Sequence, residues 1–272
     1  MRIGIIGAGR IGGTIASRLS AAGHYVQLAN SRGPDSVRDV AEAAGAIAAH
    51  VRNAVTGADV VITSVPFPRL PTLREDLYYA PTCAVFIDTS NYFPFKDGLI
   101  PGVGDGQVES EWVAEQLGRP IIKAWNNILA ESFSAKATEA GTPGRIALAV
   151  AGDDAKAKAT AMDLVNLTGF DAVDSGAISD SWRQQPGTPA YCTELDAHSL
   201  HEALASADRS RLAERRELMV ARMLELGDRV TNDDLLRLSR EIYLRPAADI
   251  RQRSEAEREG SARIKGSHWT SA

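Results

Sequence analysis

Residues 2–12 form the stretch Arg2-Ile3-Gly4-Ile5-Ile6-Gly7-Ala8-Gly9-Arg10-Ile11-Gly12, in which an apolar run enters a glycine-rich turn. Gly7 permits a tight exit from a strand, and Gly9 lacks the Cβ that would keep the backbone away from a pyrophosphate. Gly12 lets the next helix, expected over about 11–22, pack closely on that strand. The first amides of this helix would face the pyrophosphate. We therefore predict a dinucleotide-binding turn made of Gly7, Gly9, Arg10, Ile11 and Gly12.

The end of the second expected strand, 25–29, indicates which dinucleotide is bound. A site for NAD(H) usually has an Asp or Glu here for the ribose hydroxyls, whereas this chain has Asn30. Ser31 and Arg32 supply a hydroxyl and a guanidinium, which suit a 2′-phosphate that a carboxylate would repel. The pattern predicts NADP(H) as the cofactor, bound by Asn30, Ser31 and Arg32. The alternative is that Ser31 to Pro34 is only a polar turn after a strand.

The composition is that of an ordinary globular protein, and it excludes several classes of partner. Hydrophobic residues make up 44% of the 272 residues and charged residues 24%, with a net charge of −5. An acidic chain of this kind presents no basic field for nucleic acid or an anionic membrane. The two cysteines have neither disulfide-framework nor zinc-site spacing. We expect no metal, no apolar run long enough for a membrane, and a cytoplasmic location.

Strands and helices alternate along the first two thirds of the chain. This alternation predicts an α/β fold of the doubly wound Rossmann type, with a mainly parallel sheet covered on both faces and a helical C-terminal region. The expected strands are 2–6, 25–29, 46–49, 59–65, 84–88, 120–125, 146–151 and 170–173. The expected helices between them are 35–44, 53–57, 70–79, 108–117 and 153–167. We assign residues 1–176 to an NADP-binding Rossmann domain.

The remainder of the chain has a different character. Residues 176–191 are rich in turn formers, 193–226 form a long helical stretch, and a last helix at 232–244 stops before Pro246. We assign 177–246 to a helical region for substrate binding and dimerisation, because a long helix needs a second surface for its apolar stripe. Residues 247–272 are predicted to be a mobile polar tail. The protein is thus expected to form a homodimer.

The carboxyl ends of parallel strands indicate where ligands bind in such a sheet. Further candidates for cofactor contact therefore lie after the fourth, fifth and sixth strands: Ser64, Val65, Pro66, Asn91 and Asn126. Lys123 lies inside the strand before Asn126, an arrangement like the Lys and Asn pairs of dehydrogenases, so both are candidate catalytic residues. The alternative for Lys123 is that it only reaches solvent or a carboxylate.

At these strand exits the chain resembles the NADPH-dependent deazaflavin reductase family. The resemblance rests on Ser64-Val65-Pro66, Asp88-Thr89-Ser90-Asn91, residues 122–128, the Asn30-Ser31-Arg32 site and residues 173–176, and it covers about residues 1–176. It implies hydride transfer between NADP(H) and a deazaflavin, in a pocket closed by the Asn126 segment and the C-terminal helices. The module is also similar to the flavin-using reductase domains of the STEAP metalloreductases. Trp125 stands where the family usually has Phe, and it is expected to form a flat wall for the substrate.

A loop at 179–192 departs from the family and leaves the acceptor open. Trp182 could stack on a substrate, Arg183 could bind an anionic one, and Tyr191 could donate a proton to a carbonyl or imine. Alternatively, Trp182 fills a core gap and Arg183 caps helix carbonyls. His198 and His201 have a spacing that a metal could use, but a solvated helix face explains them better.

Two classes of function follow from these patterns. The first is an NADP(H)-dependent oxidoreductase that transfers hydride between nicotinamide and a small molecule, namely a deazaflavin, a flavin or a small carbonyl or imine. The second is a non-catalytic regulatory protein that senses NADP(H). The absence of an obvious acid-base pair favours the sensor, whereas the polar aromatic loop at Trp182 favours the enzyme.

Overall fold

The computed structural model describes residues 1–227 and 230–244, and its central feature is a six-stranded sheet. All neighbouring strands are parallel, and they lie in the order β3-β2-β1-β4-β5-β6. This is the doubly wound order, whose direction of winding reverses between β1 and β4. The predicted Rossmann sheet is therefore confirmed. Its strands are β1 (Arg2–Ile6), β2 (Tyr25–Ala29), β3 (Ile47–Ala49), β4 (Val60–Thr63), β5 (Val85–Asp88) and β6 (Ile122–Lys123).

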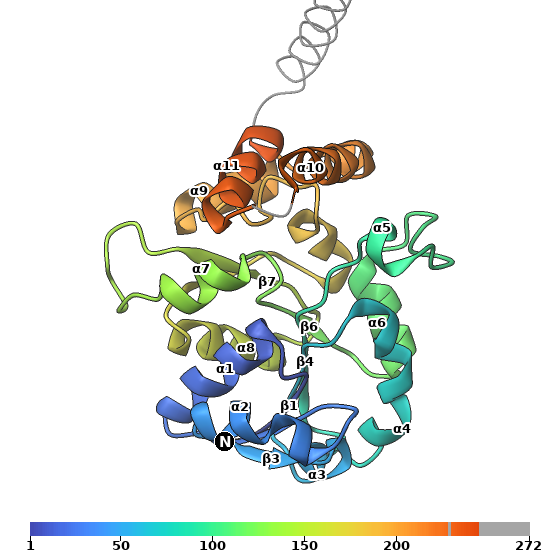
Figure 1. Ribbon diagram of the computed structural model, residues 1–272, viewed down its shortest axis with the longest axis vertical. Coiled ribbons are helices and arrows are strands. Elements are labelled where there is room, and N and C mark those ends of the chain that lie inside the picture. The colour runs from blue at the N-terminus through green and yellow to red at the C-terminus, as the bar shows by residue number, and fades with distance from the viewer. Residues whose placement is uncertain (228–229, 245–272) are drawn as a thin grey trace, which may run out of the picture.

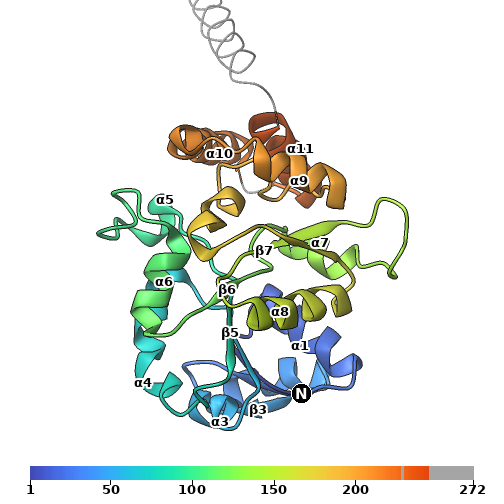
Figure 2. The same cartoon turned by 180° about the vertical axis from the view of Figure 1, so that it is seen from behind.

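Helices cover both faces of this sheet, as Figures 1 and 2 show. On one face α1 and α8 bury Ile15, Leu19 and Leu164 against the strands, and on the other α3, η2, α4 and α6 bury residues such as Leu77 and Val113. The α-helices of this layer are α1 (Arg10–Ala21), α2 (Arg38–Ala43), α3 (Val51–Val55), α4 (Arg74–Leu77), α5 (Pro94–Asp97), α6 (Glu109–Leu117), α7 (Ala130–Ala135) and α8 (Ala155–Leu167). Its 3₁₀ helices are η1 (Pro34–Val37) and η2 (Phe67–Leu73).

The last two strands do not continue the parallel sheet in the expected way. β7 (Ala147–Val150) and β8 (Asp171–Asp174) form a separate parallel pair. This pair joins the main sheet through an antiparallel bridge between Lys123 and Ala151, with N···O distances of 2.8 and 3.0 Å. The sixth strand, expected over 120–125, has only two residues in the sheet; they pair with β5 on one side, and Lys123 also pairs with Ala151 on the other.

The expected long helical stretch at 193–226 is interrupted. Asp196 caps α9 (Ala197–Ala205), and Asp208 then accepts hydrogen bonds from the amide and hydroxyl of Ser210, which ends one helix and starts another. The predicted last helix is confirmed, with a capping box formed by Thr231 and Asp234. The remaining elements are η3 (Ile178–Gln184), η4 (Arg209–Arg211), α10 (Leu212–Leu226) and α11 (Asn232–Tyr243).

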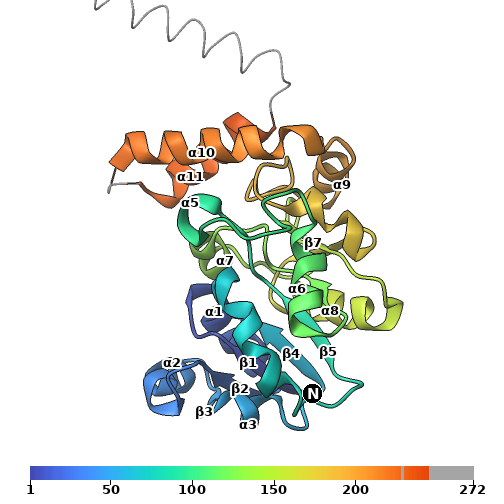
Figure 3. The same cartoon turned by 90° about the vertical axis from the view of Figure 1, so that its right-hand side faces the viewer.

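The helices α9, α10 and α11 gather at one end of the molecule, opposite the N-terminus (Figure 3). We call them the helical cap. α9 packs Leu200 and Leu204 on β7 and β8, while α10 and α11 share a small core around Met219, Ile242 and Tyr243. The predicted tail, 247–272, lies outside the described residues. Among the residues that the structure describes, no helix has the length and apolarity needed to cross a membrane.

Candidate functional site

Two glycines of the turn after β1 are required by the fold itself. Gly7 has a φ of 116°, and a Cβ on it would lie 2.0 Å from the carbonyl oxygen of Ser64. A Cβ on Gly12 would lie 2.0 Å from the carbonyl oxygen of Gly7. The backbones of β1, β4 and the start of α1 therefore approach one another so closely here that neither position has room for a side chain.

Gly9 differs, because nothing in the protein requires a glycine there. Its φ of −74° and ψ of −177° suit any residue, and a Cβ would meet no atom within 4 Å. The missing side chain therefore leaves open space directly before the first turn of α1, where amide groups and the helix dipole favour a phosphate. This cradle fits the pyrophosphate of a dinucleotide. Arg10 borders it, exposed, with its Nη2 3.7 Å from Glu131 Oε2.

The loop after β2 is held in shape by Asn30. Its Oδ1 accepts hydrogen bonds from the Arg32 amide at 2.8 Å and the Ser36 hydroxyl at 2.9 Å. The Arg32 side chain is exposed, and within the described residues its guanidinium makes no hydrogen bond or ion pair. Asn30 thus organises the loop, and Arg32 is available for an anion.

One pocket of about 400 Å³ joins the glycine turn to this loop. The predicted cofactor residues in its lining are Gly7, Gly9, Asn30, Ser31, Arg32, Ser64, Val65 and Pro66. The remaining predicted cofactor residues do not line this pocket; they are Arg10, Ile11, Gly12, Asn91 and Asn126. Arg69 and Thr72 from η2 also line the pocket, although sequence reasoning missed them. A cation six residues after the end of β4 was the available signal for Arg69.

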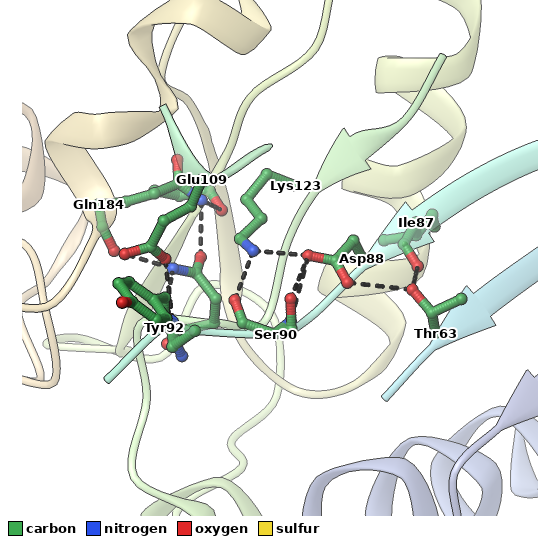
Figure 4. A network of polar contacts seen from close by, with 11 residues as sticks. Thr63, Ile87, Asp88, Ser90, Tyr92, Glu109, Lys123 and Gln184 are labelled. Carbon is green, nitrogen blue, oxygen red and sulfur yellow. Dashed lines mark hydrogen bonds and ion pairs between the residues drawn. The ribbon is translucent and has the colours of Figure 1, made fainter. Parts of the chain in front are cut away.

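Asn91 and Asn126 meet beyond the ends of β5 and β6. Asn91 Nδ2 donates to the Asn126 carbonyl oxygen at 2.9 Å, and Asn126 Nδ2 donates to Asn91 Oδ1 at 3.1 Å and to the Gln184 carbonyl oxygen at 2.9 Å. Gln184 Nε2 returns a hydrogen bond to Asn126 Oδ1 at 2.8 Å. Figure 4 shows this network. Asn126 is 2% exposed, and its amide is fully used in joining the sheet to η3.

Lys123 reaches a carboxylate, as its alternative interpretation proposed. Its Nζ lies 2.6 Å from Asp88 Oδ2 and also donates to the Ser90 carbonyl oxygen, and both side chains are fully buried (Figure 4). Asp88 also accepts from the hydroxyls of Thr63 at 3.0 Å and Ser90 at 2.8 Å. Every polar atom of this pair is therefore satisfied, as a buried ion pair requires.

A second buried carboxyl, Glu109, lies in the same network and was not anticipated from the sequence. It is the first residue of α6, and its Oε2 accepts a hydrogen bond from the Tyr92 amide at 3.2 Å (Figure 4). Burial raises the pKa of Glu109 to about 7, although Lys123, the Tyr92 amide and Arg216 oppose the shift. Glu109 therefore changes its charge near neutral pH.

The predicted substrate residues are spread over different surroundings. Trp125, with a φ of 55°, lies in the main core rather than at the pocket, and its Nε1 donates to Thr168 Oγ1 at 3.1 Å. Arg183 Nη1 donates to the Leu204 carbonyl oxygen at 3.2 Å at the end of α9, and its guanidinium lies 4.6 Å from the centre of the Trp182 ring. The contact of Arg183 is that of its structural alternative, the capping of helix carbonyls, whereas Trp182 is only partly buried beside this guanidinium.

Tyr191 packs into the core of the helical cap. Its ring is half-buried, with centroids 6.4 Å from Phe93 and 6.3 Å from Tyr243. Burial raises the pKa of Tyr191 well above its usual value. His198, the candidate for a metal, is exposed 3.5 Å from Glu202. Over the described ranges, no three His, Cys, Asp or Glu side chains form a group that could hold a metal ion.

Comparison with known proteins relates this geometry to reductases. Residues 2–92 match the family described as NADP oxidoreductase, coenzyme F420-dependent. The chain is 42% identical over 102 residues to YjhV of Escherichia coli (strain K12), a match that covers 38% of this chain and 74% of that protein.

Two solved structures are similar over most of their length. The hypothetical protein SMa0349 from Sinorhizobium meliloti is 31% identical with a TM-score of 0.61, covering 72% of this chain and 95% of that one. A "putative f420 dependent nadp-reductase" from Arthrobacter sp. FB24 is 23% identical with a TM-score of 0.53, covering 66% and 87%. The second likeness shows the shared fold alone.

Proposed function

The chain belongs to the NADP oxidoreductase family that its residues 2–92 match, and from this premise we propose that it is an NADP(H)-dependent oxidoreductase. Its acceptor would be a small molecule of the deazaflavin, flavin, carbonyl or imine type. The observation that carries the proposal is the single pocket shared by the glycine turn and the unpaired guanidinium of Arg32. A pyrophosphate at Gly9 and a 2′-phosphate at Arg32 fit the two ends of this pocket.

The preference for NADP(H) over NAD(H) is supported by the charges around the loop after β2. Asn30 is neutral, and its oxygen is already occupied by the Arg32 amide and the Ser36 hydroxyl, so it is poorly placed to hold ribose hydroxyls. Arg32 and Arg69 line the pocket from two different elements and offer two positive charges. The 2′-phosphate of NADP(H) would be bound between these two cations, whereas NADH has no phosphate at this position for them to bind.

The residues at the ends of β4, β5 and β6 would form the reaction site. When bound there, nicotinamide supplies or takes up a hydride. Pro66 and the Asn91–Asn126 pair would position its ring, and the rigid hydrogen bonds of Asn126 to Gln184 would fix the distance to the acceptor. The helical cap packs on β7 and β8 and brings Arg216 to the Tyr92 ring after β5, so it would exclude water from the transfer.

The cofactor proposal is tested by replacing Arg32 with Ala. Charge-assisted hydrogen bonds contribute about 1.5 to 3 kcal/mol each, so NADPH affinity should fall roughly tenfold to a hundredfold while NADH affinity stays nearly unchanged. Titration calorimetry with both cofactors measures this difference. Arg38→Ala is the matched control, because Arg38 carries the same charge six residues on, pairs with Asp35 and does not line the pocket. Equal losses for both cofactors in Arg32→Ala would contradict the assignment.

The same protein also distinguishes an enzyme from a sensor. Oxidation of NADPH is followed with riboflavin, a deazaflavin, benzaldehyde and a cyclic imine as acceptors. We expect turnover with at least one of them. Tight NADPH binding without any turnover would favour an NADP(H)-sensing regulatory protein.

A further inference from the structure

Glu109 is a buried carboxyl that the proposed function has not yet used. Its side chain comes from the start of α6 and reaches the backbone of Tyr92, the residue that follows Asn91 (Figure 4). The residue is 2% exposed, and within the described chain its only hydrogen bond is the one from the Tyr92 amide. No cation of the described residues lies within 4.0 Å of it. A buried carboxylate without an ion pair is costly, so the neutral acid is favoured.

The charged groups around Glu109 come from every element packed against it. Lys123 on β6 pairs with Asp88 on β5, but its charge lowers the pKa of Glu109 more than the Asp88 charge raises it. Arg216 from α10 reaches down from the helical cap, with its guanidinium 5.7 Å from the centre of the Tyr92 ring. Tyr191 approaches from the loop before α9 and is itself uncharged. The balance of burial against Lys123 and Arg216 puts the pKa of Glu109 at about 7.

Other polar atoms near Glu109 also need a partner. Ser110 Oγ follows it on α6, and Ser181 Oγ and Gln185 Nε2 lie on or next to η3, which packs against α6. All three atoms are buried, and none has a hydrogen-bond partner in the described part of the chain. Buried polar atoms of this kind are normally satisfied by ordered water or by a ligand. Water bound at these atoms, on the helix that carries Glu109 and on the packed η3 segment, would be a source for the proton that the carboxyl gives up.

We propose that Glu109 is the proton donor of the reaction, and that the acceptor is a compound with a polarised C=N or C=O bond. This inference rests on the proposed function. The acceptor carbon gains a hydride, with both electrons of the nicotinamide C4–H bond, and the electron pair of its π bond moves to the nitrogen or oxygen. That atom takes the proton from the Glu109 carboxyl. The nicotinamide is oxidised, the acceptor is reduced, and the Glu109 carboxylate is reprotonated from water.

This assignment differs from the expectation that Tyr191 donates the proton. The half-buried Tyr191 ring packs against Phe93 and Tyr243, and its raised pKa makes it a weaker acid than an ordinary phenol. Glu109 is connected to the Asn91–Asn126 pair through the backbone, because the Tyr92 amide that it binds directly follows Asn91. Its acidity also matches the pH at which a general acid works best.

The test compares Glu109→Gln with Glu111→Gln, a matched control on the first turn of the same helix. NADPH oxidation by pyrroline and by benzaldehyde is measured from pH 5 to 9 on the folded full-length chain. In the parent protein kcat should fall as pH rises through about 7, because only the protonated acid donates. Glu109→Gln should lose about a hundredfold or more in kcat and also lose this pH dependence, with NADPH affinity retained. Glu111→Gln should keep both.

Arg216→Gln gives an independent readout, since the Arg216 charge lowers the pKa of Glu109. Its loss should move the fall in kcat to higher pH. Nuclear magnetic resonance spectra of the parent protein, recorded without any acceptor, should show one carboxyl signal that titrates with the same midpoint pH as kcat. This signal should be absent from the spectra of Glu109→Gln.

The outcomes separate the two proposals. Turnover in Glu109→Gln at the parent rate and with the parent pH profile overturns the role of Glu109 but leaves the oxidoreductase intact. The role of Glu109 is also overturned if Tyr191→Phe, and not Glu109→Gln, loses the pH dependence of kcat. It is overturned as well if riboflavin is the one probe that the parent protein reduces. A parent protein that binds NADPH and reduces none of the probes overturns the proposed function itself.

Discussion

The three glycines of the turn after β1 belong to one motif but have different roles. A Cβ at Gly7 or Gly12 would collide with backbone at 2.0 Å, whereas a Cβ at Gly9 would enter empty space. The first two glycines therefore stabilise the fold, and the third keeps room for a ligand. Stability and binding can be separated by single substitutions in this turn.

Gly9→Ala and Gly7→Ala form a matched pair for this purpose. Gly9→Ala should change the free energy of unfolding by less than about 1 kcal/mol and weaken dinucleotide binding at least tenfold, because its methyl group occupies the place of the pyrophosphate. Gly7→Ala should lose about 2 kcal/mol or more of stability, owing to its φ of 116° and the clash with Ser64. Urea unfolding without cofactor and calorimetry measure the two effects. Normal binding by a stable Gly9→Ala protein would show that this glycine is dispensable.

The sequence predicted those residues of the site that belong to local motifs. Gly7, Gly9 and Arg32 follow strands that their own neighbours define, so spacing was enough to find them. Glu109 and Gln184 were missed because nothing in their neighbourhoods marks them as buried. Their burial arises only when α6 and η3 pack together, and this is a tertiary property.

At the scale of elements, Gln184 joins η3 to the sheet. Its side chain is fully buried, donates to Asn126 Oδ1 at 2.8 Å and to the Ala149 carbonyl oxygen at 3.2 Å, and accepts from the Ser175 hydroxyl at 2.6 Å. Gln184→Met keeps the volume but leaves these polar groups without their partner. Each unpaired buried group costs about 1 to 3 kcal/mol, so we expect a loss of about 2 to 5 kcal/mol in the free energy of unfolding.

Urea unfolding measures this loss, with Gln107→Met as the control. Within the described residues, the one hydrogen bond of the Gln107 side chain is an exposed one to Glu115, so its replacement should change the free energy of unfolding by less than about 0.5 kcal/mol. A stability of Gln184→Met equal to that of the control would mean that the network does not hold η3 in place.

Elements with a strong apolar pattern were predicted well, and short ones were not. The buried strands β1, β4 and β5 have nearly continuous apolar runs, which a parallel sheet requires. The four-residue α5 and six-residue α7 are too short to have a detectable period. The break between α9 and α10 escaped because the Asp208 cap lies within a sequence that otherwise favours helix. The left-handed backbone of Trp125, with a φ of 55°, is a further feature that the apolar pattern does not predict.

At the scale of the whole molecule, the sheet and the helical cap bring residues from distant parts of the chain to one place. β5, α6, β6, η3 and α10 supply Asp88, Glu109, Lys123, Gln184 and Arg216. The order β3-β2-β1-β4-β5-β6 explains this convergence, because all six strands end at the same edge. The alternation of strands and helices was sufficient to predict that edge. It could not predict how the cap would cover it.

The end of α10, in the helical cap, carries exposed leucines that a second copy of the chain could cover. Leu224 is 74% exposed and Leu226 40% exposed at the end of α10. The two residues are two positions apart and face different sides of the helix, and a second copy of the chain could cover the more exposed one, Leu224. We propose that α10 contributes to a homodimer, in which this side chain is buried.

Light scattering at micromolar concentration should then give twice the mass of one chain. Leu224→Glu should shift the protein to the monomer, because a carboxylate cannot be buried unpaired in such an interface. Leu167→Glu is the matched control, since Leu167 is 51% exposed at the end of α8, away from the cap. A parent protein that is monomeric and still binds dinucleotide would contradict the dimer. A dimer that survives Leu224→Glu would place its interface elsewhere than on α10.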